Sequence, residues 1–303
     1  MAQEGLKVKR SSQTSSCRGT HNPLPRQLYV LECLVQPGQG GEVPREGLVG
    51  CWREPPYVYC FYDCKITDRM VADLAAKGFY VTGRYEISSA QWQRRPGPWM
   101  TVGPFRIVCP CHKKDAFLAH ALPIALHSGL VFGSGMHPTT QLCLKLLAQV
   151  FDPKSMKTVV DLGTGTGILA LAAARLGAQR VLALDVNPLA AQEAAANILE
   201  NDLEHVVFPV AAENLNAVGR FGQLLLINLE WPSLRAVLQT DDWKRFLWVL
   251  CSGYLEAQAD TLHRMLAQTH HLHSQTAEND WVASFWMRLS SSRENMAPHS
   301  PGP

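Results

Sequence analysis

A glycine-rich segment and the acid that follows it have the residue types and spacing of a nucleotide-binding turn. Residues 160–167 read V-D-L-G-T-G-T-G and lead from an apolar run into a predicted helix. Glycine lets the backbone turn tightly and lets a ligand approach without a Cβ in the way. The N–H groups at the start of the helix can face the bound group. Asp185 ends the next apolar run, where a carboxylate can accept hydrogen bonds from both hydroxyls of an adenosine ribose. The candidate binding residues of this turn are Gly163, Gly165, Gly167 and Asp185.

Two classes of ligand fit this turn. Residues 165–170 match the dinucleotide pattern G-x-G-x-x-A, which with Asp185 would suit an NAD-dependent oxidoreductase. Asp161, two residues before Gly163, favours S-adenosyl-L-methionine, because a carboxylate there would repel a pyrophosphate but could hold the ammonium of a methionine. The same carboxylate could instead brace the turn through backbone N–H groups. The residues therefore favour a methyltransferase and leave the oxidoreductase open.

A second glycine-bearing segment precedes the turn. Gly133, Gly135 and His137 stand just before Thr139 and Thr140, either of which can cap a helix over the residues that follow. Such a loop can close over a bound ligand. A plain turn with an N-cap would explain the threonines but would leave the glycines and the imidazole of His137 without a role.

Asn228 follows the apolar residues of a later predicted strand. In open α/β sheets, ligands bind outside the carboxyl ends of the strands, so Asn228 is a candidate catalytic and cofactor-binding residue. Its amide can both donate and accept hydrogen bonds. Trp231, together with His137, could line the acceptor pocket. Taken alone, an asparagine at the end of a strand is also a common turn residue.

The elements around these residues alternate between strand and helix. Apolar strands that alternate with amphipathic helices predict a mainly parallel sheet covered on both faces, which is an α/β, Rossmann-like domain. A hairpin at the end would add two antiparallel strands and make a seven-stranded sheet. The predicted strands are 158–162, 180–185, 205–210, 223–228 and 246–251, the helices 168–176, 188–201 and 254–268, and the hairpin strands 271–275 and 281–289.

The rest of the chain divides into four parts. Residues 1–26 and 290–303 are predicted to be tails, and 27–89 a small α+β domain. In that domain we predict strands at 28–35, 57–62 and 79–87, a Gly/Pro-punctuated loop at 38–50, and a helix at 68–77 with Thr67 as its cap. Residues 90–115, rich in proline and glycine, are predicted to form a linker with one strand at 105–108. The large domain takes 116–289.

The composition of the chain bears on membrane association, cellular compartment and metal binding. The 303 residues are 47% apolar with a formal net charge of +2, and no apolar run is long enough to cross a bilayer. We therefore expect no membrane association and no secretory signal. The nine cysteines are an odd number at scattered positions, which is typical of reduced thiols in a cytoplasmic protein. Their spacing fits no zinc pattern, so no metal is expected. The basic first 26 residues are interpreted as a solvated end rather than an arm that binds nucleic acid.

The order of these motifs resembles the PrmA family of bacterial ribosomal-protein methyltransferases. Residues 132–140 are similar to the family's F-G-T-G-x-H-x-T-T loop, and 161–170 to its D-x-G-x-G-x-G-I-L-A. Residues 185–188 resemble its D-x-D-P, 252–258 its S-G-I-L-x-x-Q and 281–283 its W-V-A. The likeness covers about 129–289, over half of the chain.

The resemblance implies methylation of amines, namely lysine side chains and the N-terminal α-amine of the stalk protein of the large ribosomal subunit. It implies cofactor contacts from Thr140, Gly163, Asp185 and Asn228, and a ferredoxin-like N-terminal domain that grips the protein substrate. Residues 27–88 would be an abbreviated form of that domain. Two motif positions depart from the family: Ser134 replaces a threonine, and 228–231 read N-L-E-W in place of N-I-L-A. The second departure and the shortened domain leave open a protein that keeps the fold to bind a cofactor or partner without catalysis.

Overall fold

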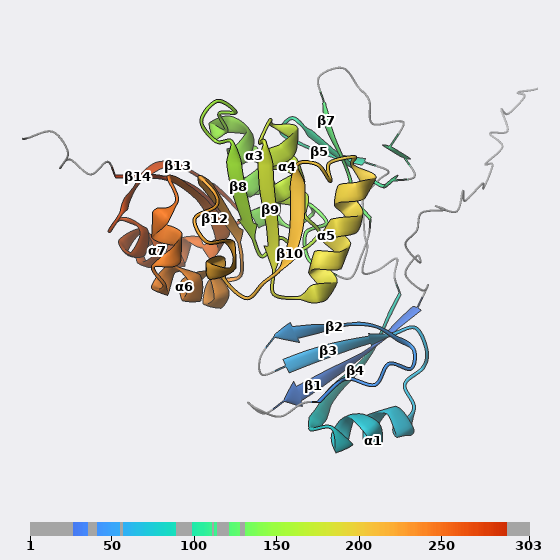
Figure 1. Cartoon of the computed structure of the whole chain (residues 1–303). Helices are drawn as coiled ribbons and strands as arrows, with labels where there is room; N and C mark the ends of the chain where they lie inside the picture. Colours follow the sequence, from blue (N-terminus) through green and yellow to red (C-terminus); the bar gives the residue numbers. More distant parts are fainter. Residues whose placement is uncertain are drawn as a thin grey trace, which may run out of the picture.

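A computed structural model describes residues 27–35, 41–54, 57–88, 99–110, 112–113, 121–127 and 131–289. The predicted tails, 1–26 and 290–303, lie outside the described residues. Figure 1 shows two bodies: a small N-terminal sheet with one helix, and a larger domain with helices on both faces of its sheet. In the part of the chain that the structure describes, no helix is long and apolar enough to cross a membrane.

The N-terminal domain is a four-stranded antiparallel sheet with one helix packed on it. Its strands are β1 (Gln27–Val35), β2 (Leu48–Glu54), β3 (Tyr57–Tyr62) and β4 (Phe79–Ser88), in the order β2-β3-β1-β4. Helix α1 (Asp68–Ala76) begins after Thr67, whose hydroxyl accepts a hydrogen bond from the backbone N–H of Met70, as the sequence predicts. Strand β2 was not predicted, because its glycine and the preceding Gly/Pro-rich residues are typical of a loop.

The predicted linker contains more structure than one strand. Strand β6 (Phe105–Val108) confirms the prediction, but β5 (Trp99–Val102) pairs with it as a hairpin, and β7 (Leu122–Ala125) pairs with its other edge. The hairpin turns at Gly103, whose φ is +55°. Val102, Phe105 and Ile107 are buried in the core of the larger domain, so this small sheet is anchored by apolar packing.

The larger domain has the predicted seven-stranded sheet. Strands β10, β9, β8, β11 and β12 are parallel, and the hairpin β13–β14 adds antiparallel strands, in the order β10-β9-β8-β11-β12-β14-β13. Their bounds are β8 Thr158–Leu162, β9 Arg180–Asp185, β10 Val207–Ala211, β11 Leu224–Asn228, β12 Trp248–Leu255, β13 His270–Glu278 and β14 Trp281–Arg288.

Helices cover the two faces of this sheet through two separate apolar cores. Helices α3 (Pro138–Val150), α4 (Ile168–Arg175) and α5 (Pro188–Glu200) pack into one core, and α6 (Trp231–Gln239) and α7 (Ala259–Leu266) into the other. Helix α6 was not predicted, because its nine residues bury only Leu234 and Leu238 and give a short apolar pattern. Helix α7 begins later than predicted, because β12 extends to Leu255 and a short 3-10 helix follows.

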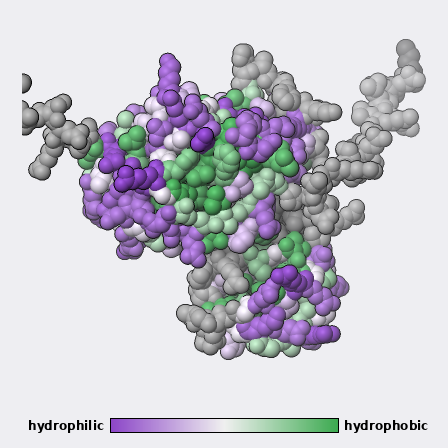
Figure 2. Space-filling view, viewed as in Figure 1, coloured by the Kyte–Doolittle hydropathy of each residue, from purple (hydrophilic) through white to green (hydrophobic). Residues whose placement is uncertain are grey.

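The connection from β10 to β11 leaves part of one sheet face without a full helix. Within the described residues it contains only the short 3-10 helix η2 (Leu215–Val218). Leu182 and Val210 are therefore half-buried, and Phe208 is 40% exposed. Figure 2 shows an apolar area on the larger domain in the region of β8 to β10, among otherwise mostly hydrophilic surroundings.

Candidate functional site

The candidate site lies where the order of the parallel strands reverses. From β8 the chain adds β9 and β10 on one side, and from β11 it adds β12 on the other, so β8 and β11 are neighbours at the switch point. Gly163 follows β8, while Asp185 and Asn228 end β9 and β11. Carboxyl ends of parallel strands share one edge, and a crevice at a switch point is where open α/β sheets bind ligands.

The glycine turn has a backbone that other residues would disturb. Gly163, Gly165 and Gly167 have φ values of +73°, +54° and +84°. A Cβ on Gly165 would lie 2.3 Å from the carbonyl oxygen of Phe132, and one on Gly163 would lie 2.2 Å from the Leu229 side chain. Gly167 is the N-cap of α4. The turn therefore depends on glycine both for its conformation and for its close contacts.

Asp161 is buried beneath the turn, with 1% of its surface exposed. Its Oδ2 accepts hydrogen bonds from the Thr164 hydroxyl at 2.6 Å and from the Ala170 backbone N–H at 3.1 Å. Burial raises the pKa of this carboxyl group to about 7, against the opposing effect of these two donors. These contacts agree with the alternative in which Asp161 braces the turn through hydrogen bonds, one of them to a backbone N–H group. Contact between Asp161 and the methionine ammonium stays a prediction.

Asp185 connects the end of β9 to the glycine turn. Its Oδ2 accepts the Gly165 N–H at 2.9 Å, and its Oδ1 accepts the Asn187 N–H at 2.9 Å. Burial raises the pKa of Asp185, and both N–H donors oppose that shift. Each carboxylate oxygen has a second lone pair, so the side chain is fixed in place and can still accept hydrogen bonds from a ligand.

The loop at 131–137 closes directly onto the turn. The Thr166 N–H donates to the Phe132 carbonyl at 3.1 Å, and its hydroxyl donates to the Gly133 carbonyl at 2.7 Å. Gly133 and Gly135 have φ values of +113° and +85°. This is the contact between loop and turn that the lid prediction requires. Whether the loop opens for a ligand stays a prediction.

His137, rather than Thr139 or Thr140, is the N-cap of α3. Its extended backbone precedes Pro138, and its Nδ1 accepts the Thr139 N–H at 3.3 Å. The expected threonine caps are wrong. Pro138 suits the first position of a helix, so the cap lies two residues before Thr139 and three before Thr140. Burial lowers the pKa of His137, which favours a neutral ring at neutral pH.

Two aromatic rings flank His137 that were not predicted as site residues. The His137 ring centroid lies 5.4 Å from that of Phe132 and 5.1 Å from that of Trp281, both edge to face. Trp281 begins β14 and comes from a distant part of the sequence. Its only sequence signal is the W-V-A motif, which does not show that the ring lies against the loop.

Asn228 contacts the helix that follows the loop. Its Nδ2 donates to the Thr140 hydroxyl at 3.3 Å. Its amide oxygen accepts no hydrogen bond from any residue that the structure describes, so it is available to a ligand. Trp231 is the first residue of α6 and packs, half-buried, against the apolar core on that side of the sheet. Its role as a pocket wall stays a prediction.

The described residues offer no metal centre. Cys60 and Cys64 are not joined in disulfide bonds. No group of three or more His, Cys, Asp or Glu side chains among the residues described here is arranged to hold a metal ion.

Comparisons with known proteins agree on one family. The model of the family described as "Ribosomal protein L11 methyltransferase (PrmA)" matches residues 88–288. A ribosomal protein L11 methyltransferase from a Cyanothece species is 31% identical over 242 residues, covering 72% of this chain and 75% of that protein. One from Chloroflexus aurantiacus is 41% identical over 128 residues, which are 42% of this chain but only 38% of that protein.

A solved structure agrees with the fold. The crystal structure of a ribosomal protein L11 methylase from Lactobacillus delbrueckii subsp. bulgaricus superimposes with a TM-score of 0.57 and 26% identity. That alignment covers 64% of this chain and all of the other. Several of the curated relatives are matched over less than two thirds of their own length, including a Geobacillus thermodenitrificans protein matched over 62%.

Proposed function

The chain belongs to the ribosomal protein L11 methyltransferase (PrmA) family, and from this premise we propose that it is an S-adenosyl-L-methionine-dependent protein methyltransferase. Its substrates in this proposal are amines of a ribosomal protein, the lysine side chains or N-terminal amine of L11. The family match spans β5 to β14 and therefore includes the whole candidate site. The oxidoreductase alternative has no support from the family.

One observation carries the proposal: a glycine turn, an anchored carboxylate and an amide with a free oxygen meet at the switch point. The cofactor fits these groups by their chemistry. Asp185 can accept hydrogen bonds from ribose hydroxyls while its two backbone donors keep it in place. Gly163 and Gly165 give the turn its positive φ angles and its close packing against Leu229 and Phe132. A neutral His137 would not repel the positive charge of a sulfonium.

Methyl transfer to an amine requires alignment more than acid–base chemistry. Bound S-adenosyl-L-methionine would supply a methyl group on a sulfonium, from which the sulfur leaves readily as a neutral thioether. The chain's own part is to orient the acceptor: Asn228, fixed by its bond to Thr140, presents its free amide oxygen to an amine N–H. The rings of Phe132 and Trp281 around His137 form an apolar border that favours the neutral, nucleophilic form of a lysine.

The N-terminal domain is the proposed recognition domain for the ribosomal protein. This domain consists of a four-stranded sheet and one helix. It contains none of the candidate site residues, all of which lie in the larger domain. It packs against the larger domain through Leu189 of α5, which contacts an apolar cluster on the sheet. A substrate bound to this domain would therefore be tethered to the domain that holds the candidate site.

Two measurements test the proposal. Calorimetry should show S-adenosylhomocysteine binding and no binding of NADH. Incubation with tritium-labelled S-adenosyl-L-methionine should transfer label to purified, unmethylated L11. Cofactor binding without transfer to L11 or any other ribosomal protein would favour a binding protein on the same fold. No cofactor binding at all would contradict the proposal.

A further inference from the structure

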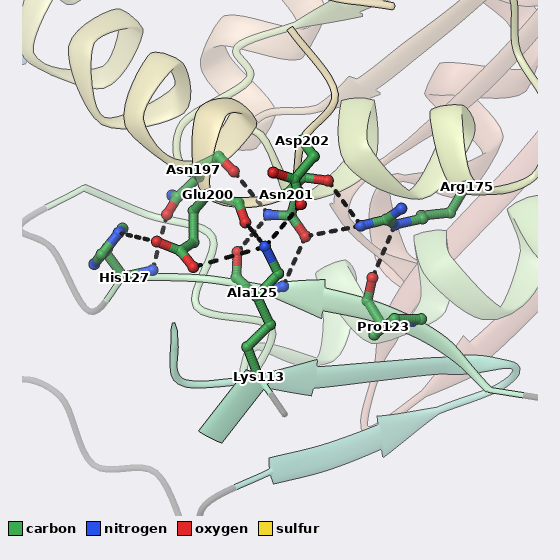
Figure 3. Close-up of polar contacts among 9 residues, drawn as sticks. All are labelled: Lys113, Pro123, Ala125, His127, Arg175, Asn197, Glu200, Asn201 and Asp202. Atoms are coloured by element: carbon green, nitrogen blue, oxygen red, sulfur yellow. Dashed lines mark hydrogen bonds and ion pairs between the residues drawn. The ribbon is translucent and has the colours of Figure 1, made fainter. Parts of the chain in front are cut away.

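Two buried asparagines, Asn197 within α5 and Asn201 at its C-cap, lie on the side of the helix that faces the small sheet of β5–β7. Asn197 is 0% exposed and Asn201 is 1% exposed. Four residues apart, they lie on the same side of the helix, among Ala194 and Ile198, which are also buried. Figure 3 shows both side chains between α5 and the backbone of β7. A buried amide destabilises the folded protein unless it forms hydrogen bonds. The groups that these two side chains bind therefore show which parts of the chain they hold in place.

Asn201 acts as a substitute for a neighbouring strand. Its Oδ1 accepts the Ala125 N–H at 2.9 Å, and its Nδ2 donates to the Ala125 carbonyl at 2.6 Å. Strand β7 is the last strand of its sheet, so this edge has no strand beside it. The guanidinium of Arg175 adds a bond from Nε to the Pro123 carbonyl at 2.9 Å. These contacts hold β7 and do not involve the glycine turn.

Asn197 makes a different pair of bonds. Its Oδ1 accepts the His127 N–H at 2.8 Å, just after β7. Its Nδ2 donates to the carbonyl oxygen of Thr166 at 2.9 Å, in the middle of the glycine turn. One side chain therefore joins the two chain segments that border the candidate cofactor site.

Thr166 extends this connection to the loop. The same residue that Asn197 binds donates its own N–H to Phe132 and its hydroxyl to Gly133. The chain that enters the loop is thus fixed at His127 directly by Asn197, and at Phe132 and Gly133 through Thr166. The close packing of Gly167 against Ala194, where a Cβ would lie 3.4 Å from the Ala194 Cβ, keeps α5 beside the turn.

We infer that Asn197 is a positioning residue of the cofactor site, whose buried amide clamps the loop entrance to the glycine turn. The inference rests on the proposed function for its effect on cofactor affinity, but the clamp itself is a property of the free protein. Asn201 is equally buried and one helical turn away. Its side chain bonds to Ala125 of β7, to the Asn197 carbonyl at 2.7 Å and to Arg175, but to neither the glycine turn nor the loop, so it provides a matched control.

The test compares Asn197→Leu with Asn201→Leu. Leucine has the same number of side-chain heavy atoms and the same branch point as asparagine, and it removes the hydrogen bonds without adding a charge. For Asn197→Leu we expect the dissociation constant of S-adenosylhomocysteine to rise about tenfold. In the free protein we expect faster hydrogen–deuterium exchange at the Thr166 N–H, which bonds to the loop. For Asn201→Leu we expect cofactor affinity within about twofold of wild type and unchanged exchange at Thr166, with a similar loss of thermal stability.

Equal effects of the two substitutions on Thr166 exchange and on cofactor affinity would overturn the inference, since both would then act only through general stability. If Asn197→Leu does not fold, Asn197→Ser removes the reach of the amide with a smaller change of shape, and the same comparison applies. Failure of the wild-type protein to bind the cofactor would contradict the proposed function, whereas the exchange of Thr166 in the free protein would still report on the clamp.

Discussion

Asp161 lies beneath the glycine turn with both of its hydrogen-bond donors on one oxygen. A carboxyl group whose pKa is about 7 in the folded protein, against an ordinary value of 3.8, favours folding in its protonated form. Its contribution to stability is fully present below the unfolded pKa and is lost as the pH rises through about 7. At alkaline pH the ionised Asp161 carboxylate therefore lowers the stability of the folded protein.

This leads to a prediction for Asp161→Asn. The variant lacks the titrating group, so its free energy of unfolding relative to wild type should rise by about 2–3 kcal/mol between pH 5 and pH 8. Urea unfolding of both proteins at the two pH values measures this difference. A constant difference across that range would show that Asp161 does not titrate there.

Asn228 contributes an amide oxygen that the structure leaves available at the site. Replacing it by alanine should lower the turnover number at least tenfold, because the acceptor amine loses the group that orients it. Thr140→Val removes only the hydroxyl that fixes the amide, and it should produce a smaller loss in the same direction. Steady-state kinetics of label transfer measures both. Unchanged turnover and cofactor affinity in Asn228→Ala would remove Asn228 from the proposed site.

Among the elements, the glycine turn and the loop at 131–137 form one unit. A Cβ on Gly165 would meet the Phe132 carbonyl, so Gly165→Ala must displace the loop as well as strain the turn. We expect cofactor affinity to fall at least tenfold in this variant.

The control for this substitution is Gly103→Ala. Gly103 has nearly the same φ, +55° against +54°, but a Cβ there would find its nearest neighbour, Lys145 Cα, at 4.0 Å. Its backbone strain is comparable, and it lies in the β5–β6 hairpin. Cofactor affinity should stay close to wild type. If both variants lost affinity equally in calorimetry, strain rather than the loop contact would be the cause.

The sequence predicts the elements whose patterns are long or well punctuated. The seven strands and α4 and α5 follow from apolar runs and from the turn residues between them. Strand β2 was missed because Gly50 and the Gly/Pro-rich residues before it are typical of a loop. Helix α6 was missed because it buries only Leu234 and Leu238, too few residues to show a period. The His137 cap has a weak sequence signal, because threonine is the commoner cap and only Pro138 at the first helical position points to the residue before it.

The site residues at the strand ends could be predicted from the sequence, whereas the residues that contact them from other elements could not. Gly163, Asp185 and Asn228 each stand at the end of an apolar run. Because parallel strands have their carboxyl ends at the same edge of the sheet, the sequence predicts that these residues lie together. Asn197 could not be identified, because a single asparagine in a helix pattern has no signal until β7 is known to lie beside it. Trp281 was likewise out of reach, because its contact with His137 joins residues far apart in the chain.

At the scale of the whole molecule, the two domains meet through a small apolar contact. Leu189, near the start of α5, packs against Leu28, Val30 and Phe61 of the N-terminal sheet. Helix α5 thus contacts the proposed recognition domain near one end and carries the Asn197 clamp further along.

Leu189→Asp tests this link. A charge in the apolar contact should loosen the two domains, so the KM for L11 should rise severalfold while the affinity for S-adenosylhomocysteine stays near wild type. Leu199→Asp places the same charge on the same helix at a residue that is 60% exposed, and it should change neither quantity. A fall in cofactor affinity in Leu189→Asp, or no change in KM, would argue against separate roles for the two domains.

The most direct test of the central claim is a crystal structure of the protein with S-adenosylhomocysteine. We expect the ligand at the carboxyl ends of β8, β9 and β11, with its ribose hydroxyls on Asp185 and its amino acid moiety beside the turn of Gly163 and Gly165. A ligand bound elsewhere, or a crevice that stays empty at saturating concentration, would contradict it.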